Sequence, residues 1–203
     1  MLRSLAASLL IILAAGCALM PPTAVVQHPR RVWRVHRARM MAMQGFRVSA
    51  QGGVRAGHHG GTLVLHWVVA PSAYRMTGYG PFGRVIFRLR ADAGGAHLRT
   101  GRGRFRGASA ERLLWRLTGW RLPVAGLRFW IRGIPAPGPV TRRRLDRAGL
   151  LASLWQDGWV IRYRRYRRTR SGRLPRLLTL THAVTAGAGR IVVTIRITRW
   201  DVI

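Results

Sequence analysis

The 203-residue sequence has no lysine, one cysteine and only five acidic residues. A single cysteine excludes an intramolecular disulfide framework and any metal site made of several cysteines. The carboxylates are too scattered to favour acid–base catalysis by a pair: they are Asp92, Glu111, Asp146, Asp157 and Asp201. The sequence also lacks a P-loop, a G-x-S-x-G elbow and an H-E-x-x-H motif. We therefore predict that the chain is not an enzyme and uses no cofactor or metal.

Basic residues are abundant by contrast. All 36 of them are arginine, and the formal net charge is +31. Such a charge favours anionic partners but does not determine a fold. A disordered basic tail is disfavoured, because 48% of the residues are hydrophobic and eight are tryptophan. The sequence therefore predicts one folded domain with a substantial core.

The first residues have the pattern of a bacterial export signal. Arg3 precedes an apolar stretch, Leu5–Leu13, that is too short to span a bilayer comfortably. The stretch ends in Leu13-Ala-Ala-Gly-Cys17, which resembles the lipobox of bacterial lipoproteins. In a lipobox the chain is cut before the cysteine, whose thiol carries a diacylglycerol and whose new amine is acylated. We therefore predict a removed signal peptide over residues 1–16 and lipidation at Cys17.

The mature chain is expected to begin with this lipid anchor and a tether. Three acyl chains would hold it on a membrane, because each buried CH₂ contributes about 0.8 kcal/mol. Ala18, rather than an aspartate, follows the cysteine, which in the pattern of bacterial lipoproteins favours the outer membrane. Residues 17–35 contain three prolines and no sustained apolar period, so we predict a tether there and a folded domain over residues 36–203.

The folded part alternates between strand and helix patterns. Asp157-Gly158 is the two-residue pair typical of a type I′ hairpin turn. Two mid-chain stretches have helical spacing, 109–120 with Ser109 as N-cap and 123–131, and they are either core-facing helices or a movable lid. Strand patterns lie at 44–50, 62–70, 73–78, 84–91, 96–100, 150–156, 159–167, 176–184 and 190–200. The sum predicts a mainly β, α+β fold with an open-barrel antiparallel sheet and helices inserted mid-chain.

A glycine-rich stretch with two adjacent histidines lies between the first two predicted strands. It reads Arg55-Ala-Gly-His-His-Gly-Gly61, and we expect a flexible loop there. No carboxylate or thiolate nearby completes a metal-binding set with His58 and His59, so a metal site is not favoured.

The densest run of charge covers residues 162–170, where arginines alternate with tyrosines. A single-stranded nucleic-acid groove uses such a pattern, but an exported lipoprotein meets little nucleic acid, so we predict no nucleic-acid partner. Anionic lipid headgroups are the other candidate ligand. We predict that this contact is made by Arg164, Arg165, Arg167 and Arg168, and an ordinary solvated surface stays open as the alternative.

An apolar residue occupies the tip of a tight turn at Tyr79-Gly-Pro-Phe-Gly83. The turn chemistry predicts that Phe82 faces outward, although the ring could also fold back on the core. Tryptophans are spread along the predicted strands and helices. They either fill a packed core or line a cavity for acyl chains.

Taken in order behind the lipobox, these motifs resemble the LolB family of outer-membrane lipoproteins. Members of that family receive other lipoproteins from the periplasmic carrier LolA and insert them into the outer membrane. The resemblance runs from Cys17 to the C-terminus and rests on the segments 74–83, 113–114, 122–124, 127–135, 156–163, 174–175 and on Trp200. Phe82 falls where the family has a protruding leucine.

The resemblance implies an incomplete antiparallel β-barrel closed by helices over an apolar cavity. It also implies site residues: a membrane-insertion loop made of Tyr79, Pro81 and Phe82, and a cavity or lid made of Trp67, Leu114, Leu127, Trp130 and Ile131. The implied partners are a LolA-like carrier, lipoprotein acyl chains and outer-membrane phospholipid, met by a monomer that faces the periplasm. The alternative is a lipid-anchored envelope module whose arginines bind anionic lipid or another polyanion without transfer.

Overall fold

The computed structural model describes residues 28–119, 122–183 and 189–203. Most of this part is β-structure. The strands are β1 Phe46–Ala56, β2 His59–Val69, β3 Tyr74–Tyr79, β4 Val85–Asp92, β5 Gly95–Thr100, β6 Gly103–Gly107, β7 Arg142–Leu145, β8 Leu151–Gln156, β9 Trp159–Tyr163, β10 Tyr166–Thr169, β11 Gly172–Pro175, β12 Leu177–Ala183 and β13 Arg190–Val202. The helices are α1 Pro29–Met41, α2 Ala110–Thr118 and α3 Val124–Trp130, with a short 3₁₀ turn η1 at Pro81–Gly83.

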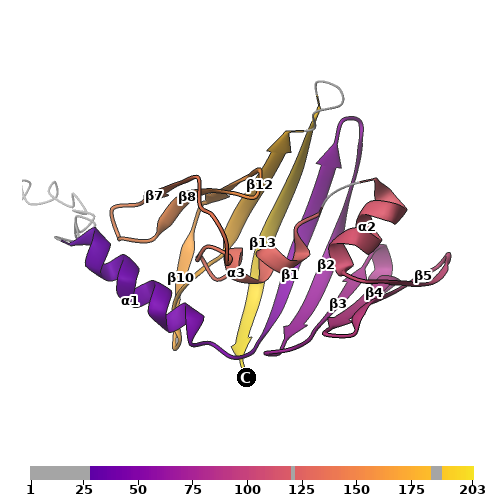
Figure 1. Cartoon of the computed structure of the whole chain (residues 1–203), viewed down its shortest axis with the longest axis horizontal. Helices are drawn as coiled ribbons and strands as arrows, with labels where there is room; N and C mark the ends of the chain where they lie inside the picture. The colour runs from indigo at the N-terminus through magenta and orange to yellow at the C-terminus, as the bar shows by residue number, and fades with distance from the viewer. Residues whose placement is uncertain (1–27, 120–121, 184–188) are drawn as a thin grey trace, which may run out of the picture.

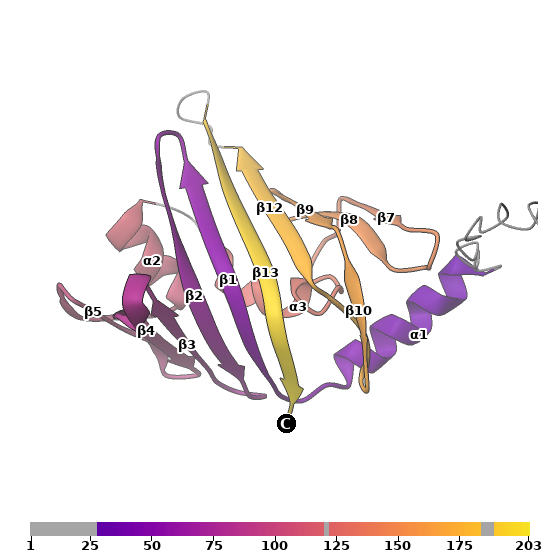
Figure 2. The same cartoon turned by 180° about the vertical axis from the view of Figure 1, so that it is seen from behind.

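Eleven of the described strands form one antiparallel sheet in the order β6-β5-β4-β3-β2-β1-β13-β12-β9-β8-β7, and β10 and β11 form a separate hairpin. The sheet is open, because β6 and β7 at its two ends do not pair with each other. Its strands bend around α2 and α3, which lie on one face (Figures 1 and 2). This arrangement confirms the predicted mainly β fold, an incomplete antiparallel barrel with helices inserted mid-chain.

Alternation along the strands places apolar side chains on the face that carries α2 and α3. In β4, Leu89 and Ala91 are buried on this inner face, whereas Arg88 and Arg90 are exposed on the other. The period of two follows from the pleat of the backbone. Each large apolar side chain that is fully buried contributes about 1.5–3 kcal/mol to the stability of the fold. The largest fully buried side chains include Trp67, Trp130, Phe46, Met40, Leu89 and Leu113.

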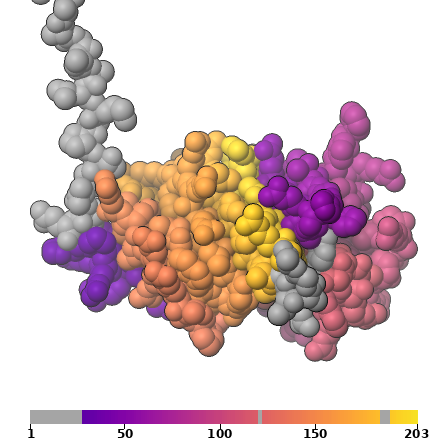
Figure 3. Space-filling view, turned by 90° about the horizontal axis from the view of Figure 1, so that it is seen from above, coloured from indigo at the N-terminus to yellow at the C-terminus, as the bar shows by residue number. Residues whose placement is uncertain are grey.

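Helix α1 corrects the predicted tether. The helix begins at Pro29, so the folded part starts inside the stretch 17–35 rather than at residue 36. Trp33, His36 and Met40 form the buried stripe of α1, and the histidine in the middle of that stripe hides the apolar period from the sequence. The start of α1 packs closely on the turn between β7 and β8, where a Cβ at Gly149 would lie only 2.7 Å from the carbonyl oxygen of Pro29. α1 lies at the opposite end of the molecule from the β3–α2 region (Figure 3).

The β1–β2 hairpin corrects the predicted flexible loop at 55–61. Both strands continue through the glycine-rich stretch in register, with Arg55 opposite Gly60 and Ala56 opposite His59. Glycine keeps its backbone donor and acceptor, so the ladder of hydrogen bonds does not need side chains there. Gly57 makes the turn possible with a φ of 58°.

Other strand predictions are confirmed with small changes of boundary, except for one. The predicted strand 159–167 ends at Tyr163, and after Arg165 the chain starts the separate β10–β11 hairpin. The sequence patterns did not predict β6 or β7, which contain few apolar residues. The type I′ turn is confirmed, since Asp157 and Gly158 both have positive φ, at 53° and 75°.

The two mid-chain helices are confirmed. The Ser109 side chain accepts a hydrogen bond of 3.2 Å from the N–H of Arg112, which caps the start of α2 as predicted. Gly119 ends α2 in the left-handed conformation, with a φ of 72°. Among the described residues, no helix is long and apolar enough to cross a membrane.

Candidate functional site: an apolar pocket and an exposed loop

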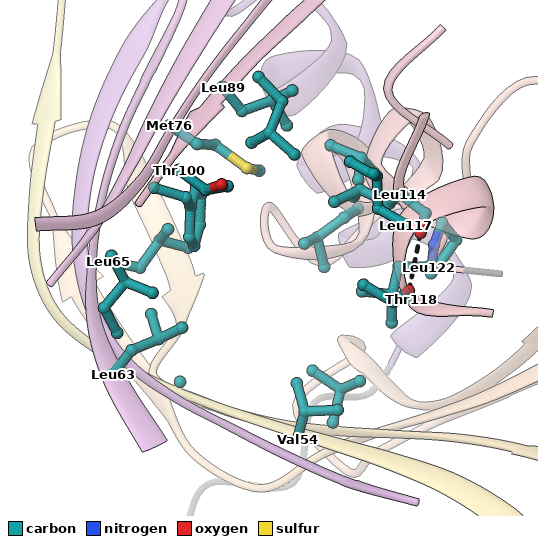
Figure 4. Close-up of a pocket in the computed structure, with 18 of the residues that line it drawn as sticks. Val54, Leu63, Leu65, Met76, Leu89, Thr100, Leu114, Leu117, Thr118 and Leu122 are labelled. Carbon is teal, nitrogen blue, oxygen red and sulfur yellow. Dashed lines mark hydrogen bonds between the residues drawn. The ribbon is translucent and has the colours of Figure 1, made fainter. Parts of the chain in front are cut away.

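A pocket of about 500 Å³ lies between the sheet and the two mid-chain helices (Figure 4). This volume is in the range of about 300–1,000 Å³ that is usual for ligand pockets. Leu63, Leu65, Met76 and Leu89 project into it from neighbouring strands, and Leu114 and Leu117 face them from α2 (Figure 4). Strands far apart in the sequence contribute further apolar residues, namely Leu98, Phe105, Leu180, Val193 and Ile195.

A glycine in β1 widens the space above the sheet. Gly52 lies in the pocket wall, opposite the pocket residue Leu63, in the middle of a strand that pairs without a break to β2. A strand position without a side chain leaves room for a ligand to approach the backbone. Gly52 therefore leaves space that the side chain of Val54, two residues further along the same face, occupies.

The pocket offers almost nothing polar to a ligand. Thr100, Arg102 and Thr118 are its only lining residues with polar side chains in the described part of the chain. The hydroxyl of Thr118 donates a hydrogen bond of 2.7 Å to the carbonyl oxygen of Leu114 within α2, so it is already satisfied (Figure 4). Such a surface favours the hydrocarbon part of a ligand and not a charged or hydroxylated one.

Helices α2 and α3 cover this pocket together. A carboxylate oxygen of Glu111 in α2 accepts a hydrogen bond from the backbone N–H of Ala125, in the first turn of α3. The positive end of a helix dipole favours a carboxylate, so one side chain stabilises the N-termini of both helices. Leu122, Pro123, Val124 and Leu127 continue the apolar lining across the junction.

The structure places the predicted cavity or lid residues in two environments. Leu114 and Leu127 line the pocket. Trp67, Trp130 and Ile131 do not, and all three are buried in the surrounding core. The strand residue Trp67 packs edge-on against Phe46 and Tyr74.

Trp130 has a structural contact that explains its burial. Its indole N–H donates a hydrogen bond of 2.9 Å to Oε1 of Gln156. The same amide oxygen accepts from the N–H of Ala136 at 3.0 Å, and the amide nitrogen donates to the Ala136 carbonyl at 2.8 Å. Gln156 therefore satisfies the polar groups of α3 and of the proline-rich turn after it, which is a positioning role rather than a contact with ligand.

The loop between β3 and β4 is the second feature of the site. Phe82 is completely exposed, with a relative accessibility of 106%, so the alternative that its ring folds back on the core is wrong. It occupies the left-handed region with a φ of 58°, which is unfavourable for a residue other than glycine. Pro81 is exposed beside it, and Tyr79 is half-buried against His66, with 5.1 Å between the ring centroids.

Comparison with known proteins identifies the family of this chain. The family model of the outer membrane lipoprotein LolB matches residues 44–200. The chain belongs to the LolB family. The LolB proteins of Stutzerimonas stutzeri and Pseudomonas putida are 36% and 37% identical to it over 170 and 175 residues. These alignments cover 82% of this chain and 82% of the first relative, and 84% and 85% for the second.

A solved structure shares the fold. The LolA superfamily protein from Nitrosomonas europaea superposes with a TM-score of 0.53 over 89% of this chain and 94% of that chain, at 12% sequence identity. This chain and that protein thus share the incomplete-barrel fold.

A buried arginine anchors α1 to the LolB-family core. Arg132 donates hydrogen bonds to the carbonyl oxygens of Arg128 at 3.0 Å and Met43 at 3.3 Å, and also to that of Met40. Its guanidinium lies 5.0 Å from the ring centroid of Phe129. Burial, and then the charge of Arg128, lower the pKa of Arg132 to about 10, which still leaves it charged at neutral pH. No sequence motif pointed to this role.

The remaining predicted site residues of this LolB-family chain lie apart from the pocket. Arg164 and Arg165 are exposed between β9 and β10, and Arg167 and Arg168 are exposed on β10. Cys17 and the predicted signal peptide lie outside the described residues. Within the described residues, no three His, Cys, Asp or Glu side chains form a group that could hold a metal ion.

Proposed function

We propose that this chain is an outer-membrane lipoprotein receptor, which accepts lipoproteins from a LolA-like carrier and inserts them into the outer membrane. Membership of the LolB family supports this role. The observation that carries the mechanism is the apolar pocket of about 500 Å³ beneath α2 and α3. It provides an interior where acyl chains can leave water without any polar group of the protein being buried unpaired.

Acyl transfer of this kind requires no catalysis. Each CH₂ that moves from a weaker to a stronger apolar environment contributes about 0.8 kcal/mol, so a chain can pass downhill from carrier to receptor to bilayer. The receptor therefore acts by binding and release, as a lipoprotein-transport protein. The transfer needs no input of chemical energy.

Release is the step that we assign to the loop of Tyr79, Pro81 and Phe82. Phe82 keeps an apolar tip at the position of the family's protruding leucine, and its full exposure allows it to enter the bilayer. An anchor at Cys17 would keep the domain on the periplasmic side of the outer membrane, close enough for this contact. A monomer is sufficient, since the pocket is formed by elements of one chain.

The alternative, a lipid-anchored module that binds anions without transfer, has less support. It requires no acyl cavity, whereas the structure has an apolar pocket that a dry, packed core does not need. The arginines that this alternative invokes are compatible with either role.

The experiment that tests the function places a charge in the pocket. Leu117 lines the pocket from α2 but is 38% exposed, so its replacement leaves the buried core intact. Leu117→Glu is expected to lower the yield of lipoprotein accepted from a purified LolA-like carrier at least tenfold, because a carboxylate in an apolar site opposes acyl burial.

Two control variants make this result specific. Leu117→Met keeps the apolar volume and is expected to accept lipoprotein normally. Arg116→Glu adds a carboxylate to the exposed part of the same helix and is expected to accept it nearly normally. Acceptance by Leu117→Glu equal to that of Leu117→Met would refute the proposal that the pocket receives acyl chains.

A further inference from the structure

Six arginines gather on the outer face of the four strands at one end of the sheet. We call this set the arginine face, and its members are Arg75 on β3, Arg88 and Arg90 on β4, Arg99 on β5, and Arg104 and Arg106 on β6. All six are exposed. They line one groove of about 340 Å³ together with His97. The residues between them in sequence, such as Met76 and Leu98, face the acyl pocket on the other side of the sheet.

The arginine face contains like charges directly opposite one another. Arg88 is opposite Arg99, and Arg99 is opposite Arg104, so three arginines form a row across β4, β5 and β6. Arg75 is likewise opposite Arg90. Directly opposed like charges on neighbouring strands destabilise a sheet. An anion supplied from outside the chain would remove this penalty.

The chain itself offers little compensation. Asp92 is the only acidic residue between positions 74 and 107. It pairs with Arg90 at 3.3 Å, at the end of the strand, which leaves the row of Arg88, Arg99 and Arg104 without a carboxylate among the ion pairs of the described residues.

The arginine face has a clear boundary on the side of β2. The neighbouring strand β2 has Thr62, Val64, His66 and Val68 at its outer positions and no arginine at all. The arginine face therefore ends at β3, beside the exposed loop of Phe82 that joins β3 to β4.

Apolar residues of the same outer surface adjoin the arginine face. Val64, opposite Tyr79, is 41% exposed. Ile86 lies near Gly80 at the base of the loop and is 43% exposed, and it also lines the apolar pocket. Together with Phe82, these residues leave apolar surface exposed close to the guanidinium groups. Apolar and aromatic residues bordered by arginine are typical of protein surfaces that lie in the interface of a bilayer.

We propose that the arginine face binds the headgroups of anionic phospholipids and orients the Phe82 loop toward the bilayer. Guanidinium groups bind phosphate oxygens in a bidentate manner, and each arginine near an anionic membrane adds to the attraction. The proposal rests on the proposed function only in placing the chain at a membrane. It differs from the predicted lipid contact of Arg164, Arg165, Arg167 and Arg168, which lie on another part of the molecule.

Binding to vesicles tests this proposal without any lipoprotein cargo. The full chain is used with Cys17→Ser, so that no acyl anchor contributes, and its affinity is measured for vesicles of phosphatidylglycerol and phosphatidylethanolamine. The variant Arg88→Gln/Arg99→Gln/Arg104→Gln is expected to bind on the order of a hundredfold more weakly, from the loss of three arginine–membrane contacts. Vesicles of phosphatidylcholine alone should show no difference between the proteins.

A comparison variant separates a defined surface from net charge. Arg164→Gln/Arg167→Gln/Arg168→Gln loses the same three charges at exposed positions and is expected to lose much less affinity. An equal or larger loss in this variant would overturn the proposal. The thermal unfolding midpoint of the arginine-face variant should be unchanged or higher, because the opposed charges are gone.

The same variants separate the membrane from other partners and from the transfer function. If the arginine-face variant binds vesicles normally but accepts lipoprotein poorly from the carrier, the face meets an acidic carrier surface, and the proposal is wrong. If instead vesicle binding is lost as expected while the unmodified protein proves unable to insert lipoproteins, the headgroup site stands and the proposed function fails.

Discussion

Glu111 and Ala125 connect the two helices that cover the pocket: the carboxylate on α2 accepts a hydrogen bond from the backbone N–H at the start of α3. Within the described residues, this hydrogen bond joins the two helices directly. The link makes the cover of the pocket depend on one of the few acidic side chains of the protein.

Removing this carboxylate should loosen the cover. We expect Glu111→Ala to lower the free energy of unfolding by about 1–2 kcal/mol, since the N–H of Ala125 and the first turn of α2 lose their charged partner. Urea unfolding followed by circular dichroism measures the change. Glu111→Gln keeps an oxygen acceptor and should lose less, and an equal loss in the two variants would contradict the role of the hydrogen bond.

A charge at the tip of the exposed loop should separate acceptance from release. We expect Phe82→Glu to accept lipoprotein from the carrier at the normal rate but to insert it into vesicles at least tenfold more slowly, because a carboxylate resists entry into hydrocarbon. Phe82→Leu keeps an apolar tip and should insert normally. Since Phe82 is fully exposed, neither variant should unfold at a lower temperature. Unchanged insertion by Phe82→Glu would reject the assignment.

Stability should decrease in mild acid through His36. Burial lowers the pKa of His36 below its usual value of 6.5, so the folded state binds this proton less readily than the unfolded state. The stabilising effect of the neutral ring is complete above pH 6.5 and is lost as the pH falls toward the pKa of the folded state. The difference in free energy of unfolding between pH 7.5 and pH 5.5 should be smaller in His36→Leu than in the original protein. The same pH dependence in both would contradict the role of His36.

The buried guanidinium of Arg132 should be needed to hold α1 against the barrel. We expect Arg132→Ala to destabilise the protein by about 2–4 kcal/mol, because the carbonyl oxygens of Met40 and Met43 lose their donor while staying buried. Hydrogen exchange of the α1 amides locates the effect, and these amides should lose more protection than those of β13. Uniform loss of protection across the molecule would argue against a specific anchor.

The sequence predicts the inner strands of the sheet and the mid-chain helices better than it predicts the two edge strands, β6 and β7. Regular alternation in 84–91 and helical spacing after Ser109 are local patterns, and both are confirmed because one face of each element is buried. Strand β7 has three successive arginines and no such pattern. It pairs with β8, and Arg142 lies 5.2 Å from the ring centroid of Trp155, so a long-range contact compensates for its composition.

At the site too, features that depend on local sequence could be predicted, and features that depend on contacts between distant segments could not. The exposure of Phe82 follows from the chemistry of its turn and could be predicted. The pocket could not be assigned residue by residue, because a strand's inner face can either pack or line a cavity. Trp67 and Leu65 share that face of β2, yet only Leu65 reaches the pocket, since Phe46 and Tyr74 enclose the indole.

The most direct test of the account is to detect acyl chains inside the pocket. The photoreactive residue p-benzoylphenylalanine is placed at Leu114, which lines the pocket, or at Arg116, which is exposed on the same helix. After incubation with a lipoprotein-loaded carrier and irradiation, mass spectrometry identifies the crosslinked atoms. The account predicts adducts to the acyl chains at Leu114 and few or none at Arg116. Equal adducts at the two positions, or adducts at Leu114 only to the polypeptide of the lipoprotein, would contradict it.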